Sequence, residues 1–422
     1  MIEKVKRNTF ITALLVFLII VSPIVIVIYN VLINDQSYTF WYGYIVVVGL
    51  LSLVNGIINY LFVKNKKDYV ILLLIGSLLM AFLAMLFSGN IQQSFWGSIF
   101  RHSGFLSYLC FFGYFLNAIF LNKKYYKKIG VIFLIITVFI CIITLMNNNI
   151  TYRLFYYHDY PKTARINYPY HAIYYNANHL GYYLTFSTII SIFMFFQERT
   201  WKKIFYLISY EVILYTIIIN NTFGSYLGIL FMLPLVGIYA IKNKKKMDCL
   251  VVIILFIVNS MFISFHDFYV VKSNFDGLLT STVETGKKQI SDDAGTGRIG
   301  VWKKLISYIK ESPILGYGGE NMNQKYLDEH ISPRSPHNII LEIMAYNGIP
   351  CAIMYFGALL IIVWRYFKKK LFHNVATCLL LSCGSYFISS LFGNITFYIS
   401  PYFVILLGLL FGVESGFYEK NS

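Results

Sequence analysis

Two side chains in the last third of the sequence are suited to chemistry. His337 is followed by Asn338, and Arg298 lies about forty residues upstream in the same polar stretch. An imidazole can accept or donate a proton near neutral pH, whereas a guanidinium stays charged and binds anionic oxygens through two parallel hydrogen bonds. Together they indicate proton transfer beside an anionic group.

Arg298 begins a segment in which apolar residues recur at helical spacing until Pro313. The pattern predicts a short helix with Lys303, Lys304 and Lys310 facing water or lipid headgroups. The helix dipole disfavours a cation in the first turn. Arg298 therefore needs another reason to be there, such as an anion to bind.

His337 lies where the polar stretch ends, in the run Arg334-Ser335-Pro336-His337-Asn338. This order predicts a helix start, with Ser335 as N-cap, Pro336 at the first helical position and His337 in the first turn. A helix N-terminus and partial burial both disfavour the imidazolium. We therefore expect a neutral His337 that can accept a proton, and the alternative is a structural histidine at an interface.

The elements that position these residues are membrane helices. Hydrophobic residues make up 58% of the 422 positions and charged residues 13%, with a mean hydropathy of +0.63. Soluble domains carry about 25% charged residues, so this composition excludes an ordinary soluble fold. A helical span needs roughly 20 mostly apolar residues. About twelve segments qualify: 9–33, 40–62, 69–88, 103–121, 129–146, 181–197, 203–220, 224–241, 249–266, 338–364, 374–392 and 397–415.

The net charge of +16 indicates membrane topology rather than nucleic-acid binding. Basic residues gather on alternate connections, at 4–7, 64–67, 123–128, 199–203, 242–246 and 365–370. In the twelve-span arrangement these connections share one side, which the positive-inside rule makes cytoplasmic, together with both termini.

The predicted fold is thus all-α, a single polytopic helix bundle over 1–422 in the cytoplasmic (plasma) membrane. Two outer loops are too long to be turns, at 147–180 and 267–337, the latter inserted between the ninth and tenth spans. Long loops are usually functional or disordered. The second loop contains short helices, including the one that Arg298 begins, which we expect to lie on the outer membrane surface.

The first outer loop is rich in tyrosine and carries Arg153 and Arg165. Tyrosines at a membrane interface commonly form an aromatic belt. Alternatively, their rings stack on sugar faces, because the ring offers an apolar plane and a hydroxyl. The sequence leaves both interpretations open.

Acidic residues of the second loop raise two further hypotheses. Asp292-Asp293 is either a solvated turn, which we favour, or a metal site, as in glycosyltransferases that hold a nucleotide-sugar diphosphate through a cation. Glu320 and Glu342 are outward acids that would assist His337 or bind sugar hydroxyls. We predict no metal ion and no cofactor.

Three short motifs follow one another in the second loop and the tenth span: Gly297-Arg298 with Trp302, Pro313 with Gly316 and Gly318, and His337-Asn338 with Gly348. Their order, in a chain of about a dozen spans, resembles the O-antigen ligase and polymerase superfamily. In topology the resemblance covers nearly the whole chain, and in specific motifs about fifty residues. In addition, Arg165 and the run from Tyr174 to Gly181, which includes Asn178, are similar to the family's arginine and the asparagine-rich start of a span.

The resemblance implies transfer of a glycan from an undecaprenyl-diphosphate donor to an acceptor hydroxyl, without a metal, on the outer face of the membrane. Arginines suit the departing diphosphate, and the candidates are Arg165 and Arg298. His337 is the candidate general base, a role that contributes about 100- to 10,000-fold. Direct displacement by one hydroxyl would invert the anomeric centre. The predicted substrate-binding residues are Asn338, Asn178, Arg153, Arg334 and Glu320.

The leading hypothesis is a polymerase that joins lipid-linked repeat units of a capsule, an exopolysaccharide or an O-antigen, with a chain-length regulator and a flippase as partners. A ligase that moves finished polymer to another acceptor has the same motifs. A different class is a flippase for the same lipid-linked oligosaccharide, which is expected to place charges along a central path and to show internal repeats. Convergence of Arg165, Arg298 and His337 on one outward cavity would favour an enzyme.

Overall fold

The computed structural model is all-helical in the residues that it describes, which are 2–33, 38–63, 68–99, 101–146, 172–174, 176–220, 222–266, 298–322, 325, 326, 329 and 335–415. The helices are α1 (Ile2–Ile33), α2 (Tyr38–Leu61), α3 (Tyr69–Leu86), α4 (Ile91–Trp96), α5 (Phe105–Ala118), α6 (Tyr126–Met146), α9 (Ala177–Gln197), α10 (Lys202–Ile219), α11 (Phe223–Lys242), α12 (Lys246–His266), α14 (Arg298–Glu311), α16 (Ile339–Lys368), α17 (Asn374–Ser390) and α18 (Ser400–Ser415). A 3-10 turn, η1 (Lys123–Tyr125), precedes α6.

Each apolar segment predicted from the sequence overlaps one of these helices. Seven helices are long and apolar enough to cross a membrane: Thr9–Ile33, Tyr38–Leu61, Tyr69–Leu86, Lys123–Met146, Ala177–Gln197, Phe223–Lys242 and Ile339–Lys368. Three others, α5, α17 and α18, are apolar but shorter. The all-α membrane fold is therefore confirmed for the described residues, whereas the count of about twelve spans stays a prediction.

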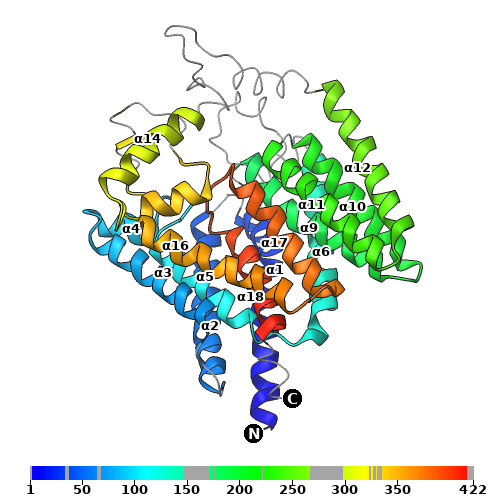
Figure 1. Ribbon diagram of the computed structural model, residues 1–422, viewed down its shortest axis with the longest axis horizontal. Helices are drawn as coiled ribbons and strands as arrows, with labels where there is room; N and C mark the ends of the chain where they lie inside the picture. The colour runs from blue at the N-terminus through cyan, green and yellow to red at the C-terminus, as the bar shows by residue number, and fades with distance from the viewer. Residues whose placement is uncertain are drawn as a thin grey trace.

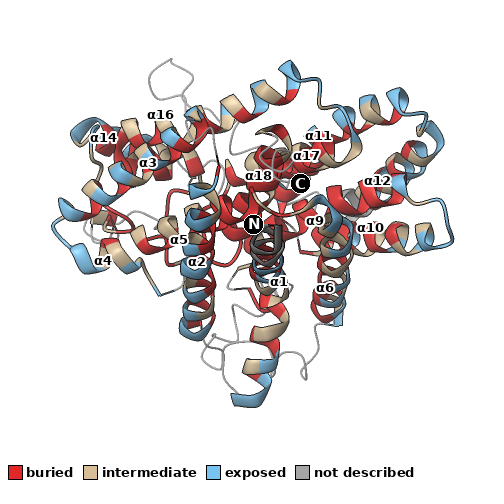
Figure 2. Cartoon of the chain, turned by 90° about the horizontal axis from the view of Figure 1, so that it is seen from below, coloured by how far each residue is buried: buried red, intermediate tan, exposed pale blue. Residues whose placement is uncertain are grey.

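Figure 1 shows α9 beside α6, α10 and α11, all of which it contacts. Its apolar window is buried at every position, and it packs against α10, α11 and α17. Figure 2 shows buried residues concentrated around α9, α17 and α18 and exposed residues on the outward faces of the surrounding helices. Those faces carry large apolar side chains, such as Leu72, Leu79 and Phe231. Apolar surface of this extent is what a bilayer covers.

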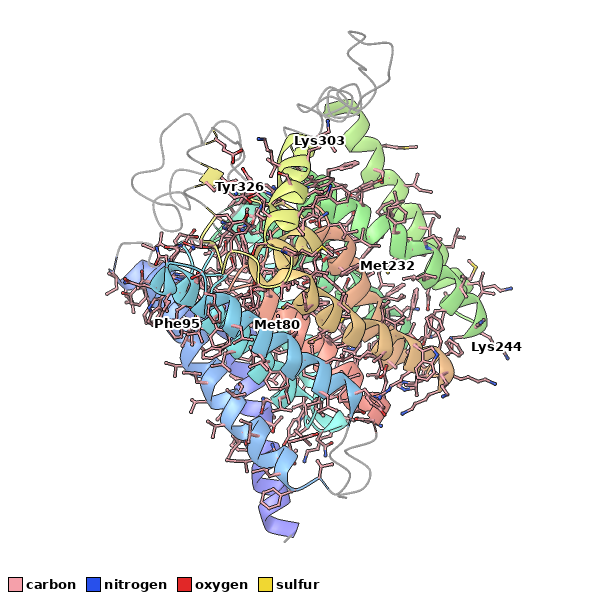
Figure 3. All side chains as sticks on the ribbon, turned by 60° about the vertical axis from the view of Figure 1, so that its left-hand side comes forward. Met80, Phe95, Met232, Lys244, Lys303 and Tyr326 are labelled. Carbon is pink, nitrogen blue, oxygen red and sulfur yellow. The ribbon has the colours of Figure 1, made fainter. Side chains whose placement is uncertain are left out.

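Ion pairs join the basic connections to one another. The Nζ of Lys127 lies 3.2 Å from Glu198, and Arg365 lies 2.7 Å from Asp68. Figure 3 shows Lys303 of α14 well separated from Lys244, which lies in the basic connection after α11. Ion pairs thus link basic connections to one another, and the connection after α11 lies away from α14.

α16 is broken at Gly348, whose φ of 85° and ψ of 163° are not helical. Such a positive φ is open to glycine at little cost. Pro350, two residues later, has no N–H to donate. The carbonyl of Tyr346 therefore loses its helical partner, and so does that of Ala345, because the N–H of Ile349 points elsewhere.

The segment 313–318 satisfies the backbone groups that the break leaves free. Its Gly316 and Gly318 have φ of 67° and 84°. Three backbone hydrogen bonds connect it to α16: from Tyr317 N to Ala345 O (2.9 Å), from Gly318 N to Tyr346 O (2.8 Å) and from Ile349 N to Pro313 O (2.8 Å). The Pro-x-x-Gly-x-Gly motif and the glycine of the His-Asn motif therefore form one structural unit.

α14 packs on this unit through its apolar face. The predicted helix from Arg298 is confirmed, and its three lysines are exposed as expected. Its buried residues form a second apolar cluster with the loop after α14 and with α16. The cluster consists of Val301, Leu305, Tyr308, Ile309, Met322, Tyr326, Ala345 and Tyr346. The position of α14 thus follows from its contact with α16.

We predict that Gly348→Ala destabilises the protein. A Cβ there would lie 1.9 Å from the carbonyl oxygen of Ile314, and a strained positive φ alone costs about 1–3 kcal/mol. The thermal unfolding temperature of the purified protein in detergent measures the effect. Gly357→Ala in the same helix is the matched control, because its Cβ would make only an ordinary contact with Leu73 at 3.7 Å. Equal unfolding temperatures for the two variants would contradict the prediction.

Candidate functional site

His337 lies in the turn that precedes α16. The helix begins directly after Asn338, which is its N-cap: the Asn338 Oδ1 accepts the backbone N–H groups of Ile340 and Leu341 at 3.0 and 3.1 Å. The prediction that Ser335 caps the helix and that His337 lies in its first turn is therefore wrong. Asparagine caps as well as serine, and His337 takes a left-handed φ of 46° just outside the helix.

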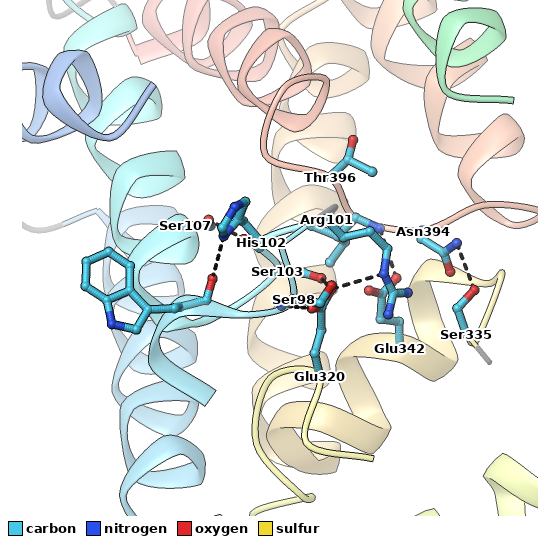
Figure 4. A network of polar contacts seen from close by, with 12 residues as sticks. Ser98, Arg101, His102, Ser103, Ser107, Glu320, Ser335, Glu342, Asn394 and Thr396 are labelled. Carbon is cyan, nitrogen blue, oxygen red and sulfur yellow. Dashed lines mark hydrogen bonds and ion pairs between the residues drawn. The ribbon is translucent and has the colours of Figure 1, made fainter. Parts of the chain in front are cut away.

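Asn394, in the connection between α17 and α18, holds this turn. Its Oδ1 accepts the backbone N–H of His337 at 2.7 Å, and its Nδ2 donates to the Oγ of Ser335 at 3.1 Å (Figure 4). The same Nδ2 lies 3.3 Å from His337 Nδ1. Asn394 was not predicted from the sequence. Its only sequence signal is the polar pair Gly393-Asn394 between two apolar segments.

α14 brings Arg298 to the same place. Trp302, one turn into α14, donates its indole N–H to the carbonyl of Pro336 at 2.9 Å, and Pro336 directly precedes His337. Burial, followed by the charge of Arg298, lowers the pKa of His337 to about 3. The imidazole is thus neutral at pH 7, as we expected. Burial is the main cause, as predicted, and nearby cations take the place of the helix terminus as the second cause.

The first turn of α9 also reaches this site. The side chain of Asn176 caps the helix by accepting the N–H of Asn178 at 2.8 Å, and Asn178 is half-buried. The next residue, His179, is buried, and its Nδ1 lies 2.5 Å from the hydroxyl of Tyr398. Tyr398 lies four residues after Asn394, so the start of α9 packs against the segment that holds the His337 turn.

A buried ion pair supports the site (Figure 4). Glu320 is fully buried, with its Oε1 3.1 Å from the Nε of Arg101 and 2.5 Å from the Oγ of Ser103. Its other oxygen accepts the backbone N–H of Ser98. Both oxygens of this predicted substrate-binding residue thus contact the protein itself.

Arg101 and Glu342 connect this ion pair to the segment of Asn394. The N–H of Phe397 donates to the carbonyl of Arg101 at 3.1 Å, and the N–H of Ile395 donates to a Glu342 oxygen at 2.9 Å. Burial works to lower the pKa of Arg101, but the charge of Glu320 outweighs it and raises the pKa above its ordinary value. Arg101 is therefore a permanent cation, and the sequence analysis missed it.

An apolar hollow adjoins the polar residues. It lies between α3, α5, α16, α17 and α18. Its lining includes Ile339 and Ile395, which directly follow Asn338 and Asn394. The site thus combines a neutral imidazole, cations and an adjacent apolar space.

Several predicted residues lie outside the described part of the chain: Arg165, Arg153, Arg334 and the pair Asp292-Asp293. Of the remaining candidates, the structure brings His337, Asn338, Arg298 and Asn178 to one end of the bundle. Within the described residues, no group of three or more His, Cys, Asp or Glu side chains is arranged to hold a metal ion.

We predict that Arg101→Met destabilises the protein far more than the loss of a surface ion pair. Removing one partner of a buried pair costs about 3–5 kcal/mol, because Glu320 is left charged and unpaired. Lys304→Met is the control, since it breaks the exposed Lys304–Glu329 pair (2.9 Å), and such pairs contribute about 0–1 kcal/mol. Unfolding in detergent measures both, and similar losses would refute a buried ion pair.

Comparison with known proteins adds two matches. Residues 208–356 match the family model described as O-antigen ligase. The general O-oligosaccharyltransferase of Acinetobacter baylyi is 25% identical over 109 residues, which are 24% of this chain and 19% of that protein. The chain thus aligns with about a fifth of that relative's length. No solved structure matches.

Proposed function

We propose that this chain, which belongs to the O-antigen ligase and polymerase superfamily, is a membrane glycosyltransferase of the polymerase type. It transfers an undecaprenyl-diphosphate-linked oligosaccharide onto a hydroxyl of a second lipid-linked repeat unit of a surface polysaccharide. The observation that carries the proposal is the meeting of α14 and the His337 turn, through the bond from Trp302 to Pro336, beside an apolar hollow.

The chemistry of these groups fits the two halves of such a donor. The guanidinium of Arg298 binds the diphosphate, whose negative charge grows as the bond to the sugar breaks. Arg165 is the second cation that we propose for this role, in place of a metal ion. The apolar hollow suits the lipid part. Asn338, Asn178, Arg153 and Arg334 would bind the sugars and phosphates around the reacting bond.

The transfer is a single displacement. The acceptor oxygen forms a bond to the anomeric carbon while the bond from that carbon to the diphosphate oxygen breaks, and the electron pair leaves with the diphosphate. One displacement inverts the anomeric centre. His337 lies next to these oxygens. The sequence suggested His337 as general base, and its Nδ1 contacts Asn394.

For the membrane we propose twelve spans, cytoplasmic termini and a site on the outer face. The support is the charge distribution: ion pairs join basic connections to one another, and the basic connection after α11 lies away from α14. Basic connections stay in the cytoplasm.

A ligase and a flippase are the two alternative functions, and each requires different features of the chain. The relative described as an O-oligosaccharyltransferase favours a ligase, which moves the glycan to a different class of acceptor. A flippase needs a polar path through the bundle. The clustering of Arg298, His337 and Asn178 at one end argues against it.

The proposal is tested with purified protein in nanodiscs and an undecaprenyl-diphosphate-linked repeat unit as both donor and acceptor. Arg298→Ala should lower the rate of transfer about 100-fold, the effect of losing a bidentate charged hydrogen bond. Lys310→Ala, an exposed lysine of the same helix, is the control and should keep the wild-type rate. The rate should not respond to EDTA. Unchanged transfer by Arg298→Ala, or loss that Mg²⁺ restores, would contradict the mechanism.

Polymerase and ligase are separated in cells that carry only the His337→Ala variant. A polymerase defect should leave single repeat units in place of long chains on a size-resolving gel, at protein levels matched to wild type. Long chains retained on the lipid carrier would instead identify a ligase, and unchanged polymer would remove His337 from the mechanism.

A further inference from the structure

We infer that Asn394 holds His337 in the tautomer with its proton on Nε2, so that His337 meets the substrate as a hydrogen-bond donor and not as a base. The tautomer follows from contacts within the protein. Only its consequence for catalysis rests on the proposed function.

The first step is the orientation of the Asn394 amide. The backbone N–H of His337 lies 2.7 Å from one atom of this amide. An N–H can only donate, so that atom is the oxygen. The other amide atom is therefore the NH₂ group, which lies 3.1 Å from Ser335 Oγ and 3.3 Å from His337 Nδ1.

The second step is the direction of the contact with the imidazole. An amide NH₂ group has two hydrogens to donate and no lone pair to accept with. The facing Nδ1 must therefore present its lone pair. Burial, Arg298, Arg101 and His179 all lower the pKa of His337, to about 3, so the ring carries one proton only. With Nδ1 bare, that proton is on Nε2.

The third step is that the Asn394 side-chain amide cannot exchange the positions of its oxygen and its NH₂ group at low energetic cost. Asn394 is buried, and the residues after it are fixed on both sides, Ile395 by the Glu342 carboxylate at 2.9 Å and Phe397 by the carbonyl of Arg101 at 3.1 Å. A reversed amide would direct its NH₂ at the N–H of His337. Two buried donors would then face each other, which costs a hydrogen bond and leaves both unsatisfied.

The chemical consequence concerns the general-base hypothesis. A base needs a lone pair on the nitrogen that meets the acceptor hydroxyl, and Nδ1, the only nitrogen with one, is already occupied by Asn394. Nε2–H instead donates to an anionic oxygen, and beside Arg298 that is an oxygen of the diphosphate. The proton of the acceptor hydroxyl then passes to the departing diphosphate, so that the bonds and charges balance without a base on the protein.

The tautomer is measured by nitrogen-15 NMR on the full chain in detergent, labelled at its eight histidines. The His337 signals are those missing from His337→Gln. At pH 7.5 we expect an unprotonated Nδ1 and a protonated Nε2. A protonated Nδ1 overturns the inference, whatever the activity of the protein.

Variants of Asn394 and Ser335 test whether Asn394 determines the tautomer of His337. Asn394→Asp replaces the donor with a carboxylate that accepts from Nδ1–H, so the tautomer should reverse. Ser335→Ala removes the other contact of the same NH₂ group and should leave the tautomer unchanged. Unshifted signals from the other histidines show that a variant is folded. A folded Asn394→Asp protein that retains the wild-type tautomer overturns the role of Asn394. If that variant does not fold, the wild-type spectrum still decides which nitrogen of His337 carries the proton.

The donor role is measured by transfer rates. The amide nitrogen of Gln reaches the place of Nε2 and donates, but a glutamine is no base. His337→Gln should therefore transfer at least about tenfold faster than His337→Ala, as expected for one hydrogen bond to a charged oxygen. Equal loss in both folded variants overturns the donor role. Absence of any transfer by the wild-type protein counts against the proposed function instead, and leaves the tautomer to the NMR result.

Discussion

The break in α16 at Gly348 is the constraint from which the site follows. A membrane helix has no water to satisfy backbone groups that lose their partners, so a break persists only where other protein groups replace them. The carbonyls of Ala345 and Tyr346 receive the N–H groups of 317 and 318. This pairing fixes the segment 313–318, and through it the end of α14. The bond from Trp302 to Pro336 then brings the first turn of α14 against His337.

The buried charges have a complementary role. Glu320 reaches back to Arg101, in a connection more than two hundred residues earlier in the chain, and the carbonyl of Arg101 fixes Phe397. Each link joins a different part of the sequence to the turn of Asn394. A buried ion pair is weak evidence for stability, because desolvation offsets the attraction. Its effect here is on geometry, since it determines where the Asn394 amide lies.

Much of the fold follows from the sequence because membrane helices need long apolar segments, and each of these overlaps a helix. The helix from Arg298 and its exposed lysines follow from periodicity for the same reason. What the sequence did not reveal are Asn394 and Arg101. Their roles depend on contacts between segments 57 to 219 residues apart, which no local pattern encodes. The helix start at His337 was misplaced because Ser335 and Asn338 are equally good caps, and only the left-handed turn at His337 selects the second.

The cations around His337 have opposite consequences before and after a substrate binds. Burial, Arg298 and Arg101 disfavour a second proton on the ring and keep it neutral. A bound diphosphate brings negative charge beside the same ring and counteracts them, because an opposite charge within a few ångströms favours the cation. Diphosphate binding therefore makes the imidazole more basic. A donor at Nε2 is insensitive to this change, since that nitrogen carries a hydrogen in both the neutral tautomer and the imidazolium. A base at the same position would be affected, because it must be unprotonated when the anion that favours its protonation is present. The electrostatics of diphosphate binding and the amide of Asn394 thus favour the same role for His337 on independent grounds.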